Sequence, residues 1–233
     1  MLTLYKKELN YYLNNPIGYI ITILFALFAN FIFIKDIFII SSASLKPFFS
    51  ILPWLLLIYI PALTMRALSE EKKTNTLELL LTLPISESQI VLSKFFALLT
   101  LTILGFFLTF FLPISLSFLT KIYLPEIIIG YLGLIFISSL FISLSLFFSS
   151  LTKNQIVAFL FSTITIFILL VISSDFLASV LPKIIQNNLI FLSPLYHLDN
   201  FIKGIVDFRS IFYFISFSLV FLFLTIIDLE KRD

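Results

Sequence analysis

The sequence contains no cysteine and a single histidine, His197. Without cysteine the chain can form no disulfide, thiol nucleophile or thiolate metal site, and one histidine excludes a multi-histidine metal cluster. Only five glycines occur, and none belongs to a glycine-rich phosphate-binding loop followed by lysine. These absences exclude ATP hydrolysis by the P-loop route, and we expect the chain to bind no metal or cofactor of its own.

Charged residues are also scarce in this chain. They make up 12% of the 233 residues, whereas 60% are hydrophobic, and the mean hydropathy is +1.13. This composition predicts an all-α protein that crosses a membrane several times and contacts membrane lipid, because only helices can satisfy their backbone polar groups within a single apolar segment. The net charge of +2 says little about partners, and we expect no nucleic acid among them.

Six apolar stretches are long enough to span a bilayer as helices: 17–34, 47–65, 95–119, 126–150, 155–174 and 211–227. We therefore expect one transmembrane domain over residues 1–233, with both termini on the same side. Nine of the 15 basic residues would lie on the side of the termini: Lys6, Lys7, Arg66, Lys72, Lys73, Lys94, Lys153, Lys231 and Arg232. Because basic residues are retained in the cytoplasm, this distribution predicts cytoplasmic termini.

Residues 1–15 precede the first apolar stretch and have an amphipathic pattern. Apolar and aromatic side chains recur at intervals of three or four residues, at Leu2, Tyr5, Leu9 and Tyr12. Polar side chains face elsewhere. The pattern predicts a helix that lies along the membrane surface and ends at Pro16.

The stretch 66–94 separates the second and third apolar stretches and carries a dense cluster of charges. Asn75 and Glu78 form a capping-box-like pair, which predicts a short helix from about Thr76. Two interpretations stay open: a charged loop whose leucine-rich segment lies on the lipid headgroups, or a docking element for a soluble partner. The candidate docking residues are Glu70, Glu71, Leu77, Glu78, Leu79, Leu80 and Leu81.

The connection 175–209 before the last apolar stretch has a pattern of its own. Ser193 followed by Pro194 predicts the start of a helix. One face of this helix would be apolar, formed by Leu195, Leu198, Phe201, Ile202 and Ile205, opposite His197, Asp199 and Lys203. We expect an amphipathic helix in the outer interface, on which His197 is a surface or capping histidine.

The apolar stretches lack the residues that active transport or catalysis would need. No ionisable residue lies near the centre of a stretch, which disfavours transport driven by protons or sodium. The serines of the fourth stretch have no nearby histidine or carboxylate to activate them, so we interpret them as helix-packing contacts. The sequence is not that of an enzyme, and it suggests a subunit whose energy comes from another chain.

Two motifs resemble those of a known family. The stretch 66–94, with Glu70-Glu71-Lys72, Thr76-x-Glu78-Leu79-Leu80, Pro84 and Lys94, resembles the first cytoplasmic loop of type 2 ABC transporter permeases. The run Leu192-Ser193-Pro194-x-x-His197-x-x-x-Phe201-x-x-Gly204-x-x-Asp207 is similar to the gliding-motility branch of that family. The family has glycine where Asn75 stands, and asparagine tolerates a left-handed backbone next best.

The resemblance implies a permease subunit of an ABC exporter in the bacterial inner membrane. It implies a homodimer, or a heterodimer with a related permease, and a separate cytoplasmic ABC ATPase. The coupling helix would fall within about residues 70–83, the interface helix would be 1–15, and outer re-entrant helices in 175–209 would include Pro194, His197, Phe201 and Gly204. An alternative stays open, in which the protein is a non-transporting membrane scaffold or assembly factor that recruits a soluble partner. The substrate cannot be inferred from the sequence.

Overall fold

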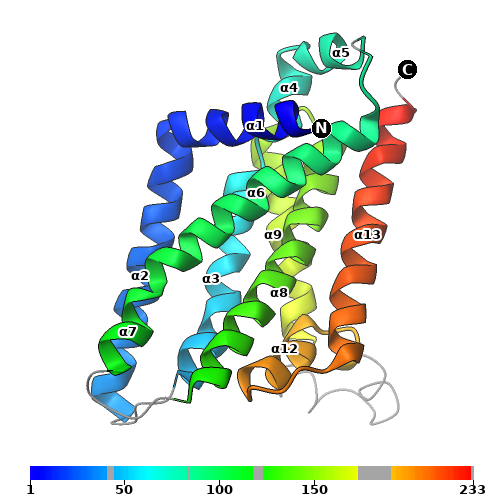
Figure 1. Ribbon diagram of the computed structural model, residues 1–233. Coiled ribbons are helices and arrows are strands. Elements are labelled where there is room, and N and C mark those ends of the chain that lie inside the picture. The colour runs from blue at the N-terminus through cyan, green and yellow to red at the C-terminus, as the bar shows by residue number, and fades with distance from the viewer. Residues whose placement is uncertain (41–44, 83, 118–122, 173–189, 232–233) are drawn as a thin grey trace.

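The computed structural model describes residues 1–40, 45–82, 84–117, 123–172 and 190–231, and within these ranges the chain is helical without any strand (Figure 1). Five helical segments are long and apolar enough to cross a membrane. The helices that form them are α2 (Pro16–Ile40), α3 (Lys46–Thr64), α6 (Glu87–Thr109), α8 (Leu124–Leu151) and α13 (Phe208–Glu230). The all-helical membrane fold and five of the six expected spans are confirmed.

The described part of the expected span at 155–174 contains one helix, α9, over Gln155–Val171, and residues 173–174 of that span, like residues 175–189 of the expected outer connection, lie outside the described residues. Its 17 residues measure about 25 Å at 1.5 Å per residue, which is less than the roughly 30 Å of a hydrocarbon core. The helix nevertheless runs beside α3 and α8 within the bundle (Figure 1). Six spans therefore remain a proposal.

Helix α8 is the centre of the bundle and contacts α3, α6, α9, α13 and α12 (Pro194–Ile202). Two glycines permit this close packing. A Cβ atom at Gly130 would lie 2.7 Å from the Phe49 ring, and one at Gly133 would lie 2.6 Å from Phe201 Cβ. The buried serines of α8 agree with a packing role, as Ser138 Oγ donates to the Leu134 carbonyl at 2.6 Å.

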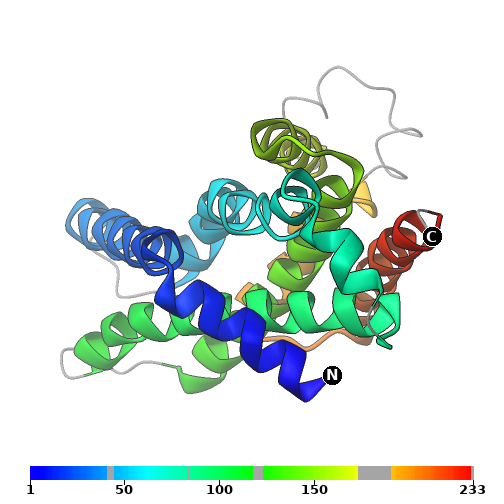
Figure 2. The same ribbon diagram turned by 90° about the horizontal axis from the view of Figure 1, so that it is seen from above.

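The short helices occupy the two ends of the bundle (Figures 1 and 2). Helix α1 (Leu2–Asn14) lies across one end, roughly perpendicular to the spans, and packs against α2 and α6. Beyond that same end stand α4 (Ser69–Lys73) and α5 (Thr76–Leu81). Helix α12 lies at the opposite end, and α7 (Phe111–Ser117) follows α6 there.

The turn between α4 and α5 is partly as expected. Asn75 is left-handed, with φ of 56°, which confirms that asparagine preserves the turn. The prediction that Asn75 caps α5 with its side chain is wrong, because this side chain makes no cap hydrogen bond. A side-chain cap requires an extended N-cap backbone, which the left-handed conformation does not provide. Instead the hydroxyls of Thr74 and Thr76 lie 2.9 Å apart and close the turn.

Candidate functional site

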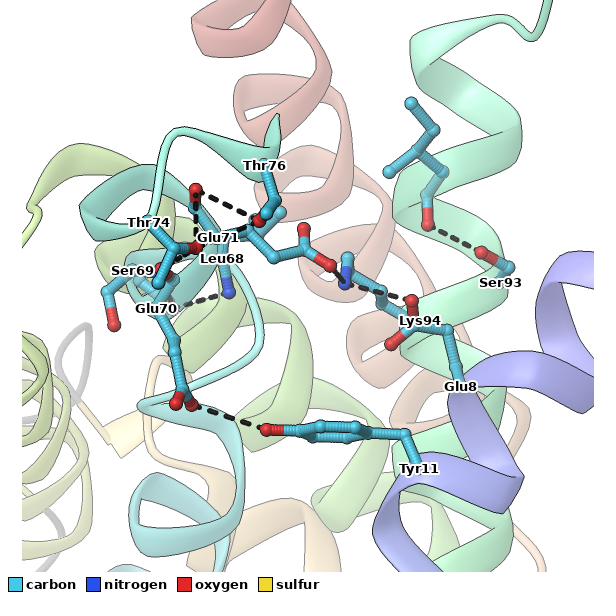
Figure 3. Close-up of polar contacts among 12 residues, drawn as sticks. Glu8, Tyr11, Leu68, Ser69, Glu70, Glu71, Thr74, Thr76, Ser93 and Lys94 are labelled. Carbon is cyan, nitrogen blue, oxygen red and sulfur yellow. Dashed lines mark hydrogen bonds and ion pairs between the residues drawn. The ribbon is translucent and has the colours of Figure 1, made fainter. Parts of the chain in front are cut away.

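Among the described residues, the most buried charged side chain lies where α1, α4 and α6 meet. Lys94, about two turns into α6, is only 1% exposed. Its Nζ lies 3.1 Å from Glu8 Oε1 of α1 and 2.7 Å from Glu71 Oε1 of α4 (Figure 3). We call Glu8, Lys94 and Glu71 the ionic clasp. It joins three helices that are far apart in the sequence.

The ionic clasp depends on having all three members. A buried ammonium is tolerated only when it is paired and hydrogen-bonded, because its charge has lost the stabilisation that water provides. Glu8 is 6% exposed and therefore needs Lys94 as much as Lys94 needs the carboxylates. If α1 or α4 moved away from α6, a buried charge would lose its partner. The ionic clasp therefore fixes the positions of α1 and α4 on α6.

Two further contacts fasten α4 to the bundle. Ser149 Oγ of α8 accepts hydrogen bonds from the backbone N–H groups of Leu68 and Ser69, both at 3.2 Å, and so satisfies donors at the start of α4. Lys72 Nζ lies 3.1 Å from Asp228 Oδ2 near the end of α13. Helix α4 is therefore tied to α6, α8 and α13 together.

A second polar contact links α1 directly to α4. The hydroxyl of Tyr11 donates to Glu70 Oε2 at 3.3 Å (Figure 3). Partial burial and then the nearby Glu70 carboxylate raise the pKa of Tyr11, so the phenol stays protonated at neutral pH and remains a donor. The contact supports the same relative placement of the two helices that the ionic clasp imposes.

The predicted docking residues divide into two groups in the structure. Leu77 and Leu80 are only 3% and 9% exposed, so their side chains are buried against this chain. Glu70 and Glu71 are half-buried and bonded within the chain, whereas Glu78 is exposed. The side chains of Leu79 and Leu81 lie outside the described part of the structure. A docking surface on α4 and α5 stays a prediction. The exposed side chains of this stretch are Lys73, Thr74, Asn75, Thr76, Glu78 and Thr82.

A cavity of about 580 Å³ lies between α1, α4, α5 and the start of α6. It is lined by Lys7, Glu8, Tyr11, Tyr12, Arg66, Ala67, Glu70, Glu71, Thr74, Thr76, Leu80 and Lys94. The acids and the bases on its wall are equal in number, with three of each. The cavity therefore suits a ligand with little net charge that can both donate and accept hydrogen bonds.

The outer motif residues lie together at the opposite end. Ser193 Oγ accepts from the Leu195 N–H at 3.3 Å, which confirms the helix start at Pro194. The helix ends at Ile202 in a Schellman motif, with Gly204 at φ of 76° and the Ile205 N–H bonded to the Asn200 carbonyl. Phe201 is fully buried against α8.

The interpretation of His197 as a surface or capping histidine is wrong. The residue is 8% exposed and its ring stacks on Tyr213 at 4.1 Å. Because Nε2 lies 2.9 Å from the Phe191 carbonyl, Nε2 carries the proton and Nδ1 accepts from Ser210 Oγ at 3.2 Å. Burial lowers the pKa of His197. The expected apolar face was also too long, since Ile205 lies past the helix end and is 57% exposed.

The sequence did not reveal that Glu8 and Lys94 belong to one ionic cluster. Glu8 was not considered, although it falls between Tyr5 and Tyr12 on the stripe that faces α6. An acid within an apolar stripe signals a buried partner, because an unpaired carboxylate would not be stable there. Lys94 was recognised as part of a motif, but its two partners are distant in sequence.

The family model described as ABC-2 family transporter protein matches residues 2–228, which is nearly the whole chain. A comparison with curated proteins gives no match. The matched region includes the ionic clasp, the cavity and α12.

Proposed function

Because the chain belongs to the ABC-2 family of transporter proteins, we propose that it is the membrane-spanning subunit of an ABC exporter. Family membership and the apolar helices make it a multi-pass membrane permease, and the family implies association with an ABC ATPase. In the proposal a separate cytoplasmic ATPase hydrolyses ATP, and this chain converts the ATPase's motion into outward movement of substrate. The chain itself performs no catalysis.

The ionic clasp is the observation that supports this role most directly. A partner that pushes on α4 and α5 can move the spans only if these short helices do not slide on the bundle. Lys94 holds α4 to α6 and α1, and Ser149 holds its start to α8. A displacement of α4 would therefore be carried into α6 and α8. The segment 70–83 would act as the coupling helix and 1–15 as the interface helix.

The finer parts of the proposal follow from the family and from the motifs at the two ends. The permease would pair with a second copy or with a related chain, in the bacterial inner membrane, with α9 as the sixth span and the termini in the cytoplasm. In the proposal the chain belongs to the gliding-motility branch, because of the sequence motif that includes Pro194, His197, Phe201 and Gly204, and α12 is one of the outer re-entrant helices.

The proposed topology can be tested by cysteine labelling, because the natural chain has no cysteine. Thr74 and Lys203 are exposed at opposite ends of the bundle. In sealed cells, Lys203→Cys is expected to react with a membrane-impermeant maleimide, whereas Thr74→Cys reacts only after the membrane is opened. Labelling of both residues from outside would overturn the assignment of α4 and α5 to the cytoplasm.

The proposed docking surface can be tested with a charge on its outward face. Glu78 is exposed on α5, so Glu78→Lys leaves the fold intact and changes only what a partner meets. Co-purification of the ATPase is expected to fall by about fivefold, as for a charge reversal at the rim of an interface. The matched control is Arg209→Glu, an exposed charge reversal at the opposite end. Full ATPase capture by Glu78→Lys would contradict docking through this face, whereas failure of the unaltered chain to capture an ATPase would favour the alternative of a scaffold.

A further inference from the structure

A second ion pair at the end of the bundle that carries α4 reaches the last span. Lys72 of α4 is 4% exposed, and its Nζ lies 3.1 Å from Asp228 Oδ2 of α13, 156 residues away in the sequence. A charge with so little exposure is tolerated only beside an opposite charge, so separation of the two side chains would be costly. The contact therefore joins α4 to the end of α13.

Helix α13 runs from this contact to the opposite end of the bundle as one continuous helix (Figure 1). Its 23 residues measure about 35 Å and include neither proline nor glycine. Helix α3, which precedes α4 in the chain, contains Pro53 and Pro61, and prolines are the usual places at which helices kink. A displacement of α4 is therefore carried to the opposite end more directly along α13 than along α3.

Helix α13 is also better placed to shift than the central helix α8. Within the apolar segments of the two helices, 33% of the residues of α13 are buried, against 67% of those of α8. Where the two helices meet, small side chains face each other, and the hydroxyls of Ser139 and Ser218 lie 3.2 Å apart. Small sliding movements of packed helices are a common form of conformational change in proteins. Helix α13 can therefore slide on α8 without displacing the rest of the bundle.

The first two turns of α13 hold the outer helix α12. The Tyr213 hydroxyl donates to the Leu192 carbonyl at 2.5 Å, and the Tyr213 ring stacks on His197 with 4.1 Å between the ring centroids. Ser210 Oγ donates to Nδ1 of the same histidine at 3.2 Å. Because hydrogen bonds and ring packing act together here, α12 follows the outer end of α13.

We propose that α13 transmits the displacement of α4 to α12, and that Asp228 is the positioning residue that makes α13 follow α4. The inference rests on the proposed function, in which an ATPase displaces α4. Lys72 then carries Asp228 with it, α13 slides on α8, and α12 shifts at the outer end through its contacts with Tyr213. Without the ion pair the ATPase still binds, because the exposed side chains of α4 and α5 are unchanged, but the outer end no longer responds to ATP.

The inference is tested with a reporter on α12 in the complete complex of permease and ATPase. Lys203, exposed at the end of α12, is replaced by cysteine in this naturally cysteine-free chain and is labelled with an environment-sensitive fluorophore before the ATPase is added. Fluorescence emission is compared between the nucleotide-free complex and the complex trapped with ATP and vanadate. A shift in emission is expected. Absence of a shift while the ATPase is bound would overturn the inference.

Variants of the ion pair decide whether the signal passes through Asp228. Lys72→Met together with Asp228→Asn removes both charges and leaves neither unpaired, so this double variant is expected to fold, retain the ATPase and lose the emission shift. The charge swap, Lys72→Asp with Asp228→Lys, is expected to restore the shift. The matched control is Glu230→Gln, which removes an exposed carboxylate at the same end of α13 and should retain the shift.

The outcomes separate this inference from the proposed function. An emission shift that persists in the double variant, or that does not return in the charge swap, would overturn the role of Asp228 and leave the proposed function intact. Failure of the unaltered chain to capture an ATPase would overturn the proposed function and the inference with it.

Discussion

Replacing Lys94 by methionine is expected to disable the protein more severely than any substitution on its surface. The change keeps the volume of the side chain but leaves Glu8 and Glu71 next to each other without a cation. Breaking a buried ion pair in this way costs about 3–5 kcal/mol. The purified chain should therefore unfold at a clearly lower temperature. In complex with its ATPase it should lose most of its effect on ATP hydrolysis, because α4 is no longer held on α6.

A triple variant separates the loss of charge balance from the loss of side-chain volume. With Lys94→Met, the additional changes Glu8→Gln and Glu71→Gln remove both unpaired carboxylates, and most of the lost stability should return. Thermal unfolding of the three proteins, measured in the same detergent, makes the comparison. If Lys94→Met alone unfolds at the same temperature as the unaltered protein, the ionic clasp does not hold α1 and α4.

Replacing Phe201 by aspartate is expected to detach α12 from the bundle. The ring is fully buried, packs on α8 at Gly133, and lies 5.9 Å from the Phe136 ring and 6.3 Å from the Phe214 ring. Loss of such a side chain costs about 3–5 kcal/mol before the burial of a charge is added. The amount of folded protein in the membrane should fall strongly, as measured by fluorescence-detected size exclusion.

Asp199→Ala is the matched control on the same helix. Asp199 is exposed and pairs with Lys203 at 2.5 Å across one helical turn, an arrangement that contributes less than about 1 kcal/mol. Its removal should leave the yield of folded protein almost unchanged. Similar small effects of Phe201→Asp and Asp199→Ala would mean that α12 is not seated on the bundle as the structure places it.

Both predictions concern contacts made by the central helix α8 or by its direct neighbours. Ser149 near one end of α8 holds the start of α4, and Gly133 towards the other end receives Phe201 of α12. Helix α8 has 28 residues, which is about 42 Å, and it is continuous over that length. In the proposed exporter, α8 would connect the surface that meets the ATPase with the outer end of the protein.

The sequence by itself determined the elements that depend on local chemistry. Composition and run length predict the apolar helices, because a membrane helix satisfies its own backbone. The turn at Asn75 and the start of α12 at Ser193 and Pro194 were predicted from single residues, since backbone conformation and capping involve only near neighbours. The amphipathic helix over residues 1–15 was predicted from spacing alone.

Only the tertiary structure decided which polar side chains are buried and which residues they contact. Lys94 meets Glu8, 86 residues away, and Glu71, 23 residues away. His197 is enclosed by Phe191, Ser210 and Tyr213 from neighbouring segments, and Leu80 turns inward instead of outward. No periodicity within one helix contains this information. The free energy of a buried charge or ring depends on the atoms that the packing of other helices brings against it.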